Sequence, residues 1–329
     1  MRAVVIHEFG GPEVLQVEDV PEPETPDGFL KVAVDAAGVN FADTHQSENS
    51  YLAAQQLPLL PGSEVVGRVI EDRSVPASGE GLVGRRVAAL VSSGGYAEQA
   101  LVHPIAAFPL PDAVTDAAAL ALLVQGLTAW HLLRTCGHLA PGESVVVHAA
   151  AGGVGTLAVQ LAKLWGAGRV IGVASSSDKR DLATSLGADV TVDAHTDDLK
   201  GALRAANEGK PVDLVLEMVG GTTFDASLAA LAPFGRIATF GLASRTPASP
   251  VDPASLMQHS RAVIGFWLAH CFGRPEMLGP PMAELLDLTA DGRLRPIVGT
   301  AYPLADARRA HEDLLARRST GKLCLDPRS

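Results

Sequence analysis

A glycine-rich turn between an apolar strand and a helix is the strongest candidate for chemistry in this sequence. Residues 145–155 read VVVHAAAGGVG, and their apolar opening is typical of a buried strand. The next residues carry apolar side chains at near-helical spacing. Gly152 and Gly153 let backbone N–H groups approach a pyrophosphate, toward which the new helix points its positive end. Gly155 lets the helix pack closely on the strand, so the stretch predicts a nucleotide phosphate site.

The residues that follow the second strand, RVIGVA at 169–174, indicate which nucleotide is bound. A residue that contacts the adenosine ribose is expected about 20 positions after the glycine turn. Ser175 and Ser176 stand there in place of the acidic residue that NAD favours, and Lys179 and Arg180 follow. Small hydroxyls with nearby cations suit the 2′-phosphate of NADP, and the alternative is a solvated loop with helix-capping serines. We therefore expect NADPH as the cofactor.

Composition limits the class of protein. The chain has 329 residues, 47% of them hydrophobic, which is enough for two domains with buried cores. A net charge of −11 argues against nucleic acid and anionic membranes as partners. No run of about 18 apolar residues predicts a transmembrane helix. The three cysteines are far apart and the N-terminal residues lack a signal-peptide pattern, so we expect a cytoplasmic protein without disulfides.

The secondary-structure pattern changes twice along the chain, which predicts an α/β protein with three segments. Residues 1–118 contain short strands separated by Gly and Pro, typical of a β-rich, barrel-like domain. Strands and helices alternate over 119–264, which favours a doubly wound parallel sheet. Residues 265–329 are expected to return to the first domain. The strand candidates of the middle segment are 145–148, 169–174, 189–192, 212–217, 235–240 and 261–265.

Several stretches together resemble one family, the zinc-free quinone oxidoreductase branch of the medium-chain dehydrogenase/reductase superfamily, which includes zeta-crystallin. The first glycine of the usual dinucleotide fingerprint is Ala150, which fits the AxxGxxG variant of this branch. Two positions depart from the pattern, because His45 and Asp193 stand where relatives often carry Tyr. The matching stretches are GVNFADTH (38–45), LPLLPGSEVVGRV (57–69), QGLTAW (125–130), PGESVVVHAAAGGVG (141–155), LGADVTVD (186–193), EMVGGTTFDASLAALAPFGRIATFGLAS (217–244) and RRSTGK (317–322).

The resemblance implies a GroES-like catalytic domain, a Rossmann domain that binds NADPH, and a homodimer formed through the nucleotide domains. It also implies which residues contact the cofactor. Lys322 and Arg317 are expected to reach the cofactor phosphates, although both would also suit a solvated helix end. The full set of expected cofactor contacts is Asn40, Thr128, Gly152, Gly153, Val154, Ser175, Ser176, Lys179, Val219, Gly241, Leu242, Phe266, Trp267, Arg317 and Lys322.

The zinc ligands of related alcohol dehydrogenases are missing from this sequence. The family's PGHE position reads Pro61-Gly62-Ser63-Glu64, so the ligating histidine is Ser63, and the first-ligand region around Asn40 holds no cysteine. We therefore expect no metal. Without a Lewis acid, activated acceptors such as quinones or α,β-unsaturated carbonyls are favoured over simple ketones.

Three polar residues near the first matching stretch are the candidates for catalysis. Asn40 is positioned to hydrogen-bond the nicotinamide ribose or a substrate oxygen, and the alternative is a tight turn. His45 and Tyr51 follow, and either could donate a proton or polarise an oxyanion. Trp267 is a candidate for the floor of the substrate pocket, or else a core or dimer residue.

The sequence therefore predicts an NADPH-dependent oxidoreductase that transfers hydride to a quinone or an α,β-unsaturated carbonyl. Two alternatives remain open. One is an enoyl reductase that acts on thioester-linked intermediates. The other is a non-catalytic NADPH-binding protein, as zeta-crystallin can be.

Overall fold

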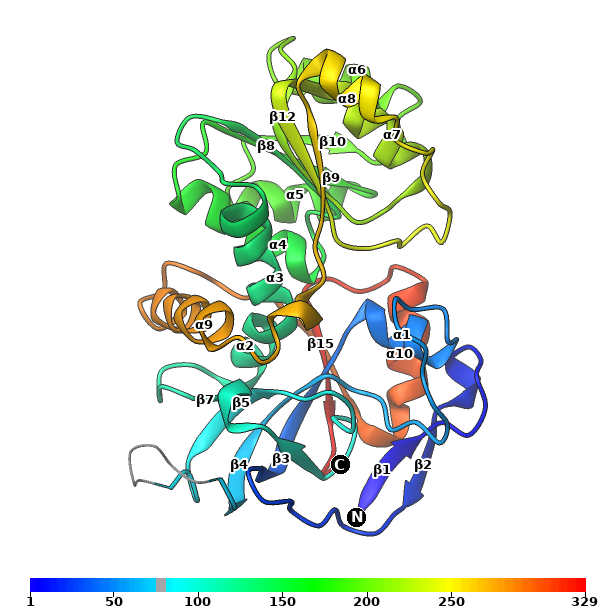
Figure 1. The fold of residues 1–329 in the computed structure, drawn as a ribbon, viewed down its shortest axis with the longest axis vertical. Coiled ribbons are helices and arrows are strands. Elements are labelled where there is room, and N and C mark those ends of the chain that lie inside the picture. Colours follow the sequence, from blue (N-terminus) through cyan, green and yellow to red (C-terminus); the bar gives the residue numbers. More distant parts are fainter. Residues whose placement is uncertain (75–80) are drawn as a thin grey trace. The chain divides into compact units, whose positions relative to one another are not determined.

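The computed structural model describes residues 1–74 and 81–329, which divide into two compact units (Figure 1). Unit 1 comprises Met1–Leu127 and His270–Ser329, and unit 2 comprises Thr128–Ala269. The first division falls inside a helical segment, a few residues after the expected change at 118/119. The second division falls at 269/270, and His270–Ser329 belong to unit 1 together with the N-terminal residues.

Unit 2 is built on a six-stranded sheet in which every pair of neighbouring strands is parallel. The spatial order is β10-β9-β8-β11-β12-β13, which is the doubly wound order of dinucleotide-binding domains. The central strands are almost wholly buried, which explains their continuous apolar sequences. The strands are β8 (Ser144–His148), β9 (Arg169–Ala174), β10 (Val190–Asp193), β11 (Val212–Glu217), β12 (Leu231–Thr239) and β13 (Ala262–Gly265).

Helices connect these strands, and the core of unit 2 lies between sheet and helices. Val146, Ile171, Leu203 and Phe224 belong to one cluster of buried side chains from β8, β9, α6 and α7. The six strands lie close to the six expected ones, so the fold class read from the sequence is confirmed. The helices are α3 (Leu127–His131), α4 (Gly153–Leu164), α5 (Ser177–Ser185), α6 (Leu199–Ala206), α7 (Gly221–Ala230) and α8 (Pro253–His259).

Unit 1 is β-rich, with a mostly antiparallel seven-stranded sheet and a separate hairpin of β1 and β2. The sheet has the order β14-β15-β3-β4-β5-β7, and β6 also pairs with β3. The strands are β1 (Arg2–Val5), β2 (Gln16–Asp19), β3 (Leu30–Val39), β4 (Glu64–Asp72), β5 (Arg86–Leu90), β6 (Gln99–Val102), β7 (Ala107–Pro109), β14 (Val298–Pro303) and β15 (Lys322–Asp326). The helices are α1 (Phe41–Ser47), α2 (Asp116–Ala121), α9 (Pro275–Ala290) and α10 (Ala307–Leu315).

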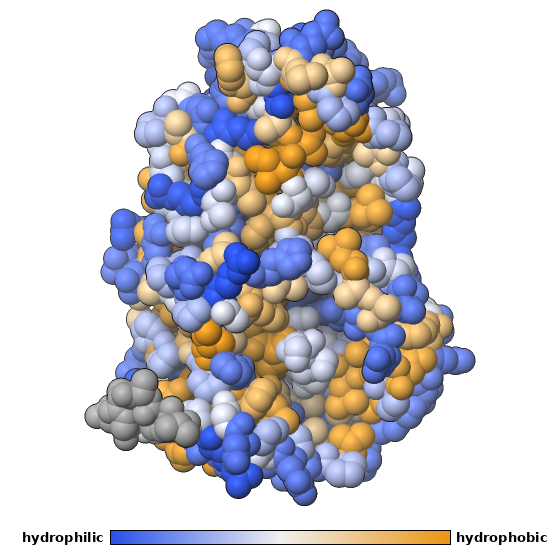
Figure 2. Space-filling model, in the orientation of Figure 1, coloured by the Kyte–Doolittle hydropathy of each residue, from blue (hydrophilic) through white to orange (hydrophobic). Residues whose placement is uncertain are grey.

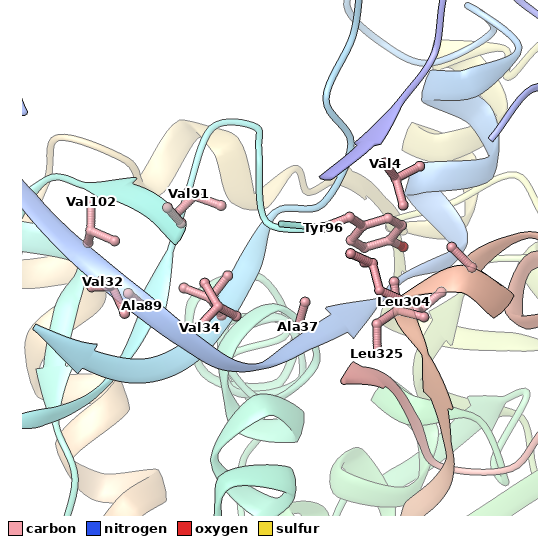
Figure 3. Close-up of a cluster of buried hydrophobic side chains, with 14 of the residues drawn as sticks. Val4, Val32, Val34, Ala37, Ala89, Val91, Tyr96, Val102, Leu304 and Leu325 are labelled. Carbon is pink, nitrogen blue, oxygen red and sulfur yellow. The ribbon is translucent and has the colours of Figure 1, made fainter. Parts of the chain in front are cut away.

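The C-terminal segment completes the sheet and the core of unit 1. Strand β15 lies between β14 and β3, where Leu323 pairs with Val39 and Leu325 with Ala37. The core contains valines from β3, β4 and β5, together with Leu304 and Leu325 from the C-terminal segment. Figure 3 shows the Tyr96 ring at one end of this cluster, beside Val4 and Leu304. Tyr96 is therefore a polar group set in an apolar core.

One continuous helical stretch, Asp116–Cys136, has a length and composition that would allow it to cross a membrane. Two-thirds of its most apolar window is buried inside the protein, as in the core helix of a globular domain. The stretch contains two π-helical turns, Leu122–Gly126 and Leu132–Cys136. On the face shown in Figure 2, polar and apolar residues are interspersed.

Candidate active site

The glycine turn of unit 2 has the backbone geometry of a phosphate-binding loop. Ala149 follows β8 with a φ of +49°, and Gly152 precedes the first residue of α4 without a side-chain cap. A Cβ atom at Gly155 would lie 2.2 Å from the Ala149 carbonyl oxygen, and one at Gly152 would lie 3.1 Å from it. Position 155 therefore admits only glycine. Because Gly152 has no side chain, no side-chain acceptor competes for the N–H groups at the start of α4. These groups can therefore bind a pyrophosphate.

The order of the strands puts this turn at the point where the sheet reverses its winding. Strands β8 and β11 are neighbours, and the chain leaves them toward opposite sides of the sheet order. Ligands bind at such switch points beyond the carboxyl ends of the strands. Gly152, Gly153 and Val154 follow β8, and Val219 follows β11. The structure thus brings these four predicted cofactor residues to the same edge of one sheet.

A buried carboxylate that the sequence analysis missed shapes the turn after β11. Glu217 accepts hydrogen bonds from the backbone N–H groups of Val219 (2.6 Å) and Gly220 (2.9 Å). Burial raises the pKa of Glu217, and the two backbone donors partly offset that rise. The signal in the sequence is an acidic residue at the end of an otherwise apolar strand. Glu217 therefore fixes the backbone of a predicted cofactor contact.

The turn after β12 packs directly against the turn after β11. The backbone N–H groups of Ala243 and Ser244 donate to Met218 and Val219, each at 2.9 Å. A Cβ atom at Gly220 would lie 2.4 Å from the end of the Leu242 side chain and 3.0 Å from the Thr246 carbonyl oxygen, so a larger residue would push these groups apart. Gly220 also has a φ of +81°, which favours glycine independently. The predicted residues Val219, Gly241 and Leu242 therefore form one local surface.

The loop expected to contact the adenosine 2′-phosphate lies at the start of α5. Ser176 caps this helix by accepting from the Lys179 N–H at 3.4 Å. Arg180 forms an ion pair with Asp193 at 2.9 Å. A backbone hydrogen bond from His195 and the charge of Arg180 lower the pKa of Asp193. The Asp193 charge is therefore compensated locally, and Lys179 and Ser175 remain the predicted contacts for a phosphate.

Two aromatic residues near the end of unit 2 and a threonine at its start are also predicted cofactor contacts. The Phe266 N–H donates to the Thr239 carbonyl at 2.9 Å, which fixes Phe266 and Trp267 just beyond β13. The Phe266 ring stacks on the buried His131 ring, with centroids 5.4 Å apart. Thr128 is buried three residues before His131, on α3. His131 was missed by the sequence analysis, because a histidine inside an apolar helix gives no local signal of an aromatic partner.

Unit 1 holds a buried ion pair where the sequence analysis expected a cofactor contact. Lys322 is completely buried, and its ammonium donates to the Glu64 carboxylate, to Asn40 Oδ1 at 2.9 Å and to the Val39 carbonyl at 3.2 Å. The prediction that Lys322 reaches the cofactor phosphates is therefore wrong. Strand β15 is inserted beside β3, so its first residue points into the core rather than toward solvent. Arg317 lies exposed after α10, and its phosphate contact stays a prediction.

Asn40 takes part in the same buried cluster. Its amide donates to Glu64 Oε1 at 2.7 Å, and the second Glu64 oxygen accepts from the Val124 N–H at 2.8 Å. The π-helical turn at Leu122–Gly126 contains that N–H group. Asn40 is 5% exposed, and each end of its amide already has one protein partner. Its contact with the nicotinamide ribose or with a substrate stays a prediction.

His45 and Tyr51, the two candidate proton donors, lie side by side. Their ring centroids are 6.3 Å apart, and the His45 Nδ1 atom lies 3.0 Å from Ser50 Oγ. His45 is on α1 and is nearly buried, whereas Tyr51 is half-buried in the loop that follows. The structure therefore brings these two residues together near the C-terminal end of α1, the helix that begins after Asn40.

Within residues 1–74 and 81–329, no group of three or more His, Cys, Asp or Glu side chains could hold a metal ion. Ser63 and Asn40, at the positions of zinc ligands in related alcohol dehydrogenases, offer a hydroxyl and an amide that zinc sites rarely use.

Comparisons with known proteins agree with the class of enzyme that the two units define. Residues 26–112 match the alcohol dehydrogenase GroES-like domain, and residues 153–287 match the zinc-binding dehydrogenase family. The chain is thus a two-domain dehydrogenase-type oxidoreductase.

Relatives over the full length narrow the class to one branch. The quinone oxidoreductase of Pseudomonas aeruginosa is 37% identical over 97% of both chains. Prostaglandin reductase-3 of Bos taurus is 36% identical over 94% of this chain and 84% of its own. The Escherichia coli quinone oxidoreductase complexed with NADPH is 32% identical, with a TM-score of 0.92 over 99% of this chain and all of that one.

The chain therefore belongs to the zinc-free quinone oxidoreductase branch of the medium-chain dehydrogenase/reductase superfamily. It is an NADPH-dependent oxidoreductase, and the glycine turn of α4 and the turns after β11 and β12 fit this cofactor.

Proposed function

We propose that this enzyme transfers hydride from NADPH to a quinone or an α,β-unsaturated carbonyl, without zinc. The name of the Pseudomonas aeruginosa relative, a quinone oxidoreductase, supports quinones as acceptors, and that of the bovine relative, a prostaglandin reductase, supports reduction of an organic substrate other than a quinone. In an enone, the hydride goes to the β-carbon, and a proton follows at the α-carbon from solvent or a side chain. In a quinone, the hydride and one proton give the hydroquinone.

The observation that carries the proposal is what occupies the place of a metal centre in unit 1. Asn40, Glu64 and Lys322 hold one another by hydrogen bonds and an ion pair. A buried carboxylate already neutralised by an ammonium is a poor ligand for a further cation. The chain therefore favours acceptors whose own conjugation stabilises the charge that hydride transfer creates.

The residues of each unit then have distinct tasks. In unit 2, the backbone of the glycine turn binds the pyrophosphate, and Lys179 with Ser175 binds the 2′-phosphate. Bound NADPH supplies the hydride. In unit 1, His45 or Tyr51 donates the proton or stabilises the developing oxyanion.

Steady-state oxidation of NADPH with a panel of quinones, enones and a pantetheine enoyl thioester tests the proposal. We expect turnover of quinones or enones that neither a chelator nor added Zn²⁺ changes by more than about twofold. A preference for the thioester would favour an enoyl reductase instead. No turnover with any acceptor, from protein shown to bind NADPH, would refute the proposed activity.

The proposal includes a homodimer formed through unit 2. Strand β13 is one of the two edges of the parallel sheet, and edges of this kind favour pairing with another chain. Phe234 and Met257 are 83% and 76% exposed, and the Phe234 N–H donates to the Ser260 carbonyl just before that edge. Light scattering should give twice the chain mass, and Phe234→Asp should halve it. A wild-type monomer at micromolar concentration would contradict this part.

A further inference from the structure

Three polar side chains from different parts of unit 1 meet in its apolar core. Tyr96 follows β5, Asp43 lies in the first turn of α1, and His311 lies on α10. The Tyr96 hydroxyl is 2.7 Å from Asp43 Oδ2 and 3.1 Å from His311 Nε2. At most 1% of each residue is exposed. Figure 3 shows that apolar side chains surround the Tyr96 ring.

The geometry fixes the direction of both hydrogen bonds. A carboxylate only accepts, so the Tyr96 O–H donates to Asp43. The phenol oxygen must then accept the N–H of His311 Nε2, so in a neutral ring Nδ1 carries no proton. Burial lowers the pKa of His311 to about 4, in agreement with the neutral ring. His311 thus orients Tyr96, and Tyr96 orients Asp43.

Asp43 passes this orientation on to the proposed active site. The same oxygen, Oδ2, accepts from the backbone N–H of Asn40 at 2.8 Å. Asn40 is the last residue before α1, and its side chain contacts Glu64 and Lys322. His45 follows Asp43 by two residues on the same helix. A shift of the Asp43 carboxylate would therefore move Asn40 and the start of the helix that carries His45.

The composition of the cluster is poorly explained by stability alone. Asp43 Oδ1 and His311 Nδ1 are buried and have no hydrogen-bond partner among the described residues. Unsatisfied buried polar atoms destabilise a fold, and apolar side chains of similar size often stabilise it more than a buried polar network does. The cluster leaves these atoms unpaired while it holds one oxygen of Asp43 from two directions. That arrangement favours a role in positioning.

We propose that Tyr96 and His311 are positioning residues that act through Asp43 to hold Asn40 and the first turn of α1 for hydride transfer. This inference rests on the proposed roles of Asn40 and His45. Both side chains lie inside the core, so neither Tyr96 nor His311 contacts the substrate.

The titratable groups around Asp43 predict a distinctive readout. Tyr96 and His311 face it from the loop after β5 and from α10, and Lys322 and Glu64 act on its charge from β15 and β4. Burial raises the pKa of Asp43 to about 6, whereas the hydrogen bond from Tyr96 lowers it. Removal of the Tyr96 hydroxyl should therefore move the acid limb of the pH–rate profile to higher pH.

The chain offers a matched control for this experiment. Tyr302 is also nearly buried in unit 1, and its hydroxyl donates at 2.7 Å to Asp313 on α10 rather than to a residue of α1. Single-turnover oxidation of bound NADPH by a quinone would be measured for wild type, Tyr96→Phe and Tyr302→Phe between pH 5 and 8. We expect Tyr96→Phe to slow hydride transfer about tenfold and to shift the acid limb upward. Tyr302→Phe should leave both unchanged.

Two further variants separate positioning from simple destabilisation. His311→Gln keeps an N–H donor near the position of Nε2 and should retain at least half of the wild-type rate, whereas His311→Leu should resemble Tyr96→Phe. The Kd for NADPH should change less than threefold throughout, because unit 2 holds the phosphates. Equal rates and pH profiles for Tyr96→Phe and Tyr302→Phe, with the wild type active, would refute the positioning role alone. An inactive wild type that binds NADPH would refute the proposed function as well.

Discussion

The proposed functional residues of the two units are of different kinds. In unit 2, the cofactor residues are mostly glycines and backbone groups at strand ends, and the atoms that fit together lie close in the sequence, as with Gly155 and Ala149. In unit 1, Lys322 meets Asn40 and Glu64 across 282 and 258 residues of sequence. The first part depends on the shape of the backbone, whereas the second depends on the balance of buried charges.

This difference teaches which kind of change each part tolerates. A backbone-built site fails when a side chain is added, because the added atoms occupy space that the chain itself needs. A charge-built site fails when one partner is removed, because the other remains buried without compensation. Four experiments test this contrast, beginning with the largest expected effect.

The largest effect is expected from Gly155→Ala. The added Cβ would lie 2.2 Å from the Ala149 carbonyl oxygen and 2.8 Å from the Ala150 Cα, so the strand and α4 must separate. We expect a loss of about 3 kcal/mol or more in the unfolding free energy, and no measurable NADPH binding at 100 µM, on the order of a hundredfold loss. Urea unfolding and fluorescence titration would measure both. Gly279→Ala is the control, because nothing lies within 4 Å of its added Cβ. Normal binding by Gly155→Ala would refute the steric argument.

The next effect is expected from Lys322→Met, which removes the charge that compensates Glu64. Breaking a buried ion pair by removing one partner typically costs about 3–5 kcal/mol. Urea unfolding should show this loss, and the double variant Glu64→Gln/Lys322→Met should recover part of it. The ratio of the Kd values for NADH and NADPH should stay unchanged, because Lys322 is buried away from solvent. A selective loss of NADPH affinity would restore Lys322 as a phosphate contact.

A change in pH is expected to have an intermediate effect on the stability of the fold, and this effect should differ between the two units. Burial lowers the pKa of His148 in unit 2 to about 4. Its unfolded pKa is about 6.5, so the unfolded state binds more protons and stability falls as the pH drops from 6.5 toward 4, by up to about 3 kcal/mol. In unit 1, His311 acts in the same direction, but Asp43 opposes it, since its raised pKa destabilises the fold as the pH rises from about 4 to about 6. Glu217 opposes His148 in the same sense in unit 2, but two backbone donors partly offset the rise in its pKa.

Hydrogen exchange at pH 4.5 and 7 would compare the core strands of the two units. We expect unit 2 to lose more protection at pH 4.5 than unit 1. His148→Gln should remove most of that loss, because the amide can still bond Ser227, which lies 2.8 Å from His148 Nε2. Equal losses in both units, unaffected by His148→Gln, would count against this origin of the acid sensitivity.

The smallest effect is expected from Lys179→Ala, which removes a side chain and leaves the backbone of α5 intact. A charged hydrogen bond is worth about 1.5–3 kcal/mol, so NADPH should bind roughly tenfold more weakly while NADH is nearly unaffected. Calorimetric titration of both nucleotides would measure this. Lys163→Ala is a control, because Lys163 pairs with Asp189 at the other end of β9 and β10. Equal affinity of the wild type for both nucleotides would contradict the NADP preference.

The sequence predicted unit 2 well because its signals are local. The six strand candidates and the glycine turn follow from periodicity and spacing within a few tens of residues, and Gly152, Gly153, Val219 and Gly241 lie where such spacing places them. The same reasoning missed Glu217 and His131. Their partners are a backbone turn and an aromatic ring, and neither leaves a recognisable spacing.

In unit 1, the positions of the site residues depend on which strands are neighbours in the sheet, and the spacing of residues along the sequence does not reveal that. Lys322 was expected at a cofactor phosphate because it belongs to a C-terminal stretch that resembles the family, but β15 enters the sheet beside β3 and turns its first residue inward. Asp43 was quoted only as part of a matching stretch. Its importance depends on Tyr96 and His311. Tyr96 lies 53 residues from Asp43 in the sequence, and His311 lies 215 residues from Tyr96.

The discontinuity of unit 1 also sets an order of events during synthesis. Unit 2 is a single stretch, Thr128–Ala269, which leaves the ribosome complete before the residues that close unit 1 are made. Glu64 and Asp43 are translated early, but Lys322 and His311 come near the end of the chain. Until then, neither carboxylate has the Lys322 ammonium to compensate its charge in the core, so both must stay hydrated. We therefore expect the nucleotide-binding unit of the nascent chain to fold first. The first 127 residues should complete their fold only after the last strand has been made.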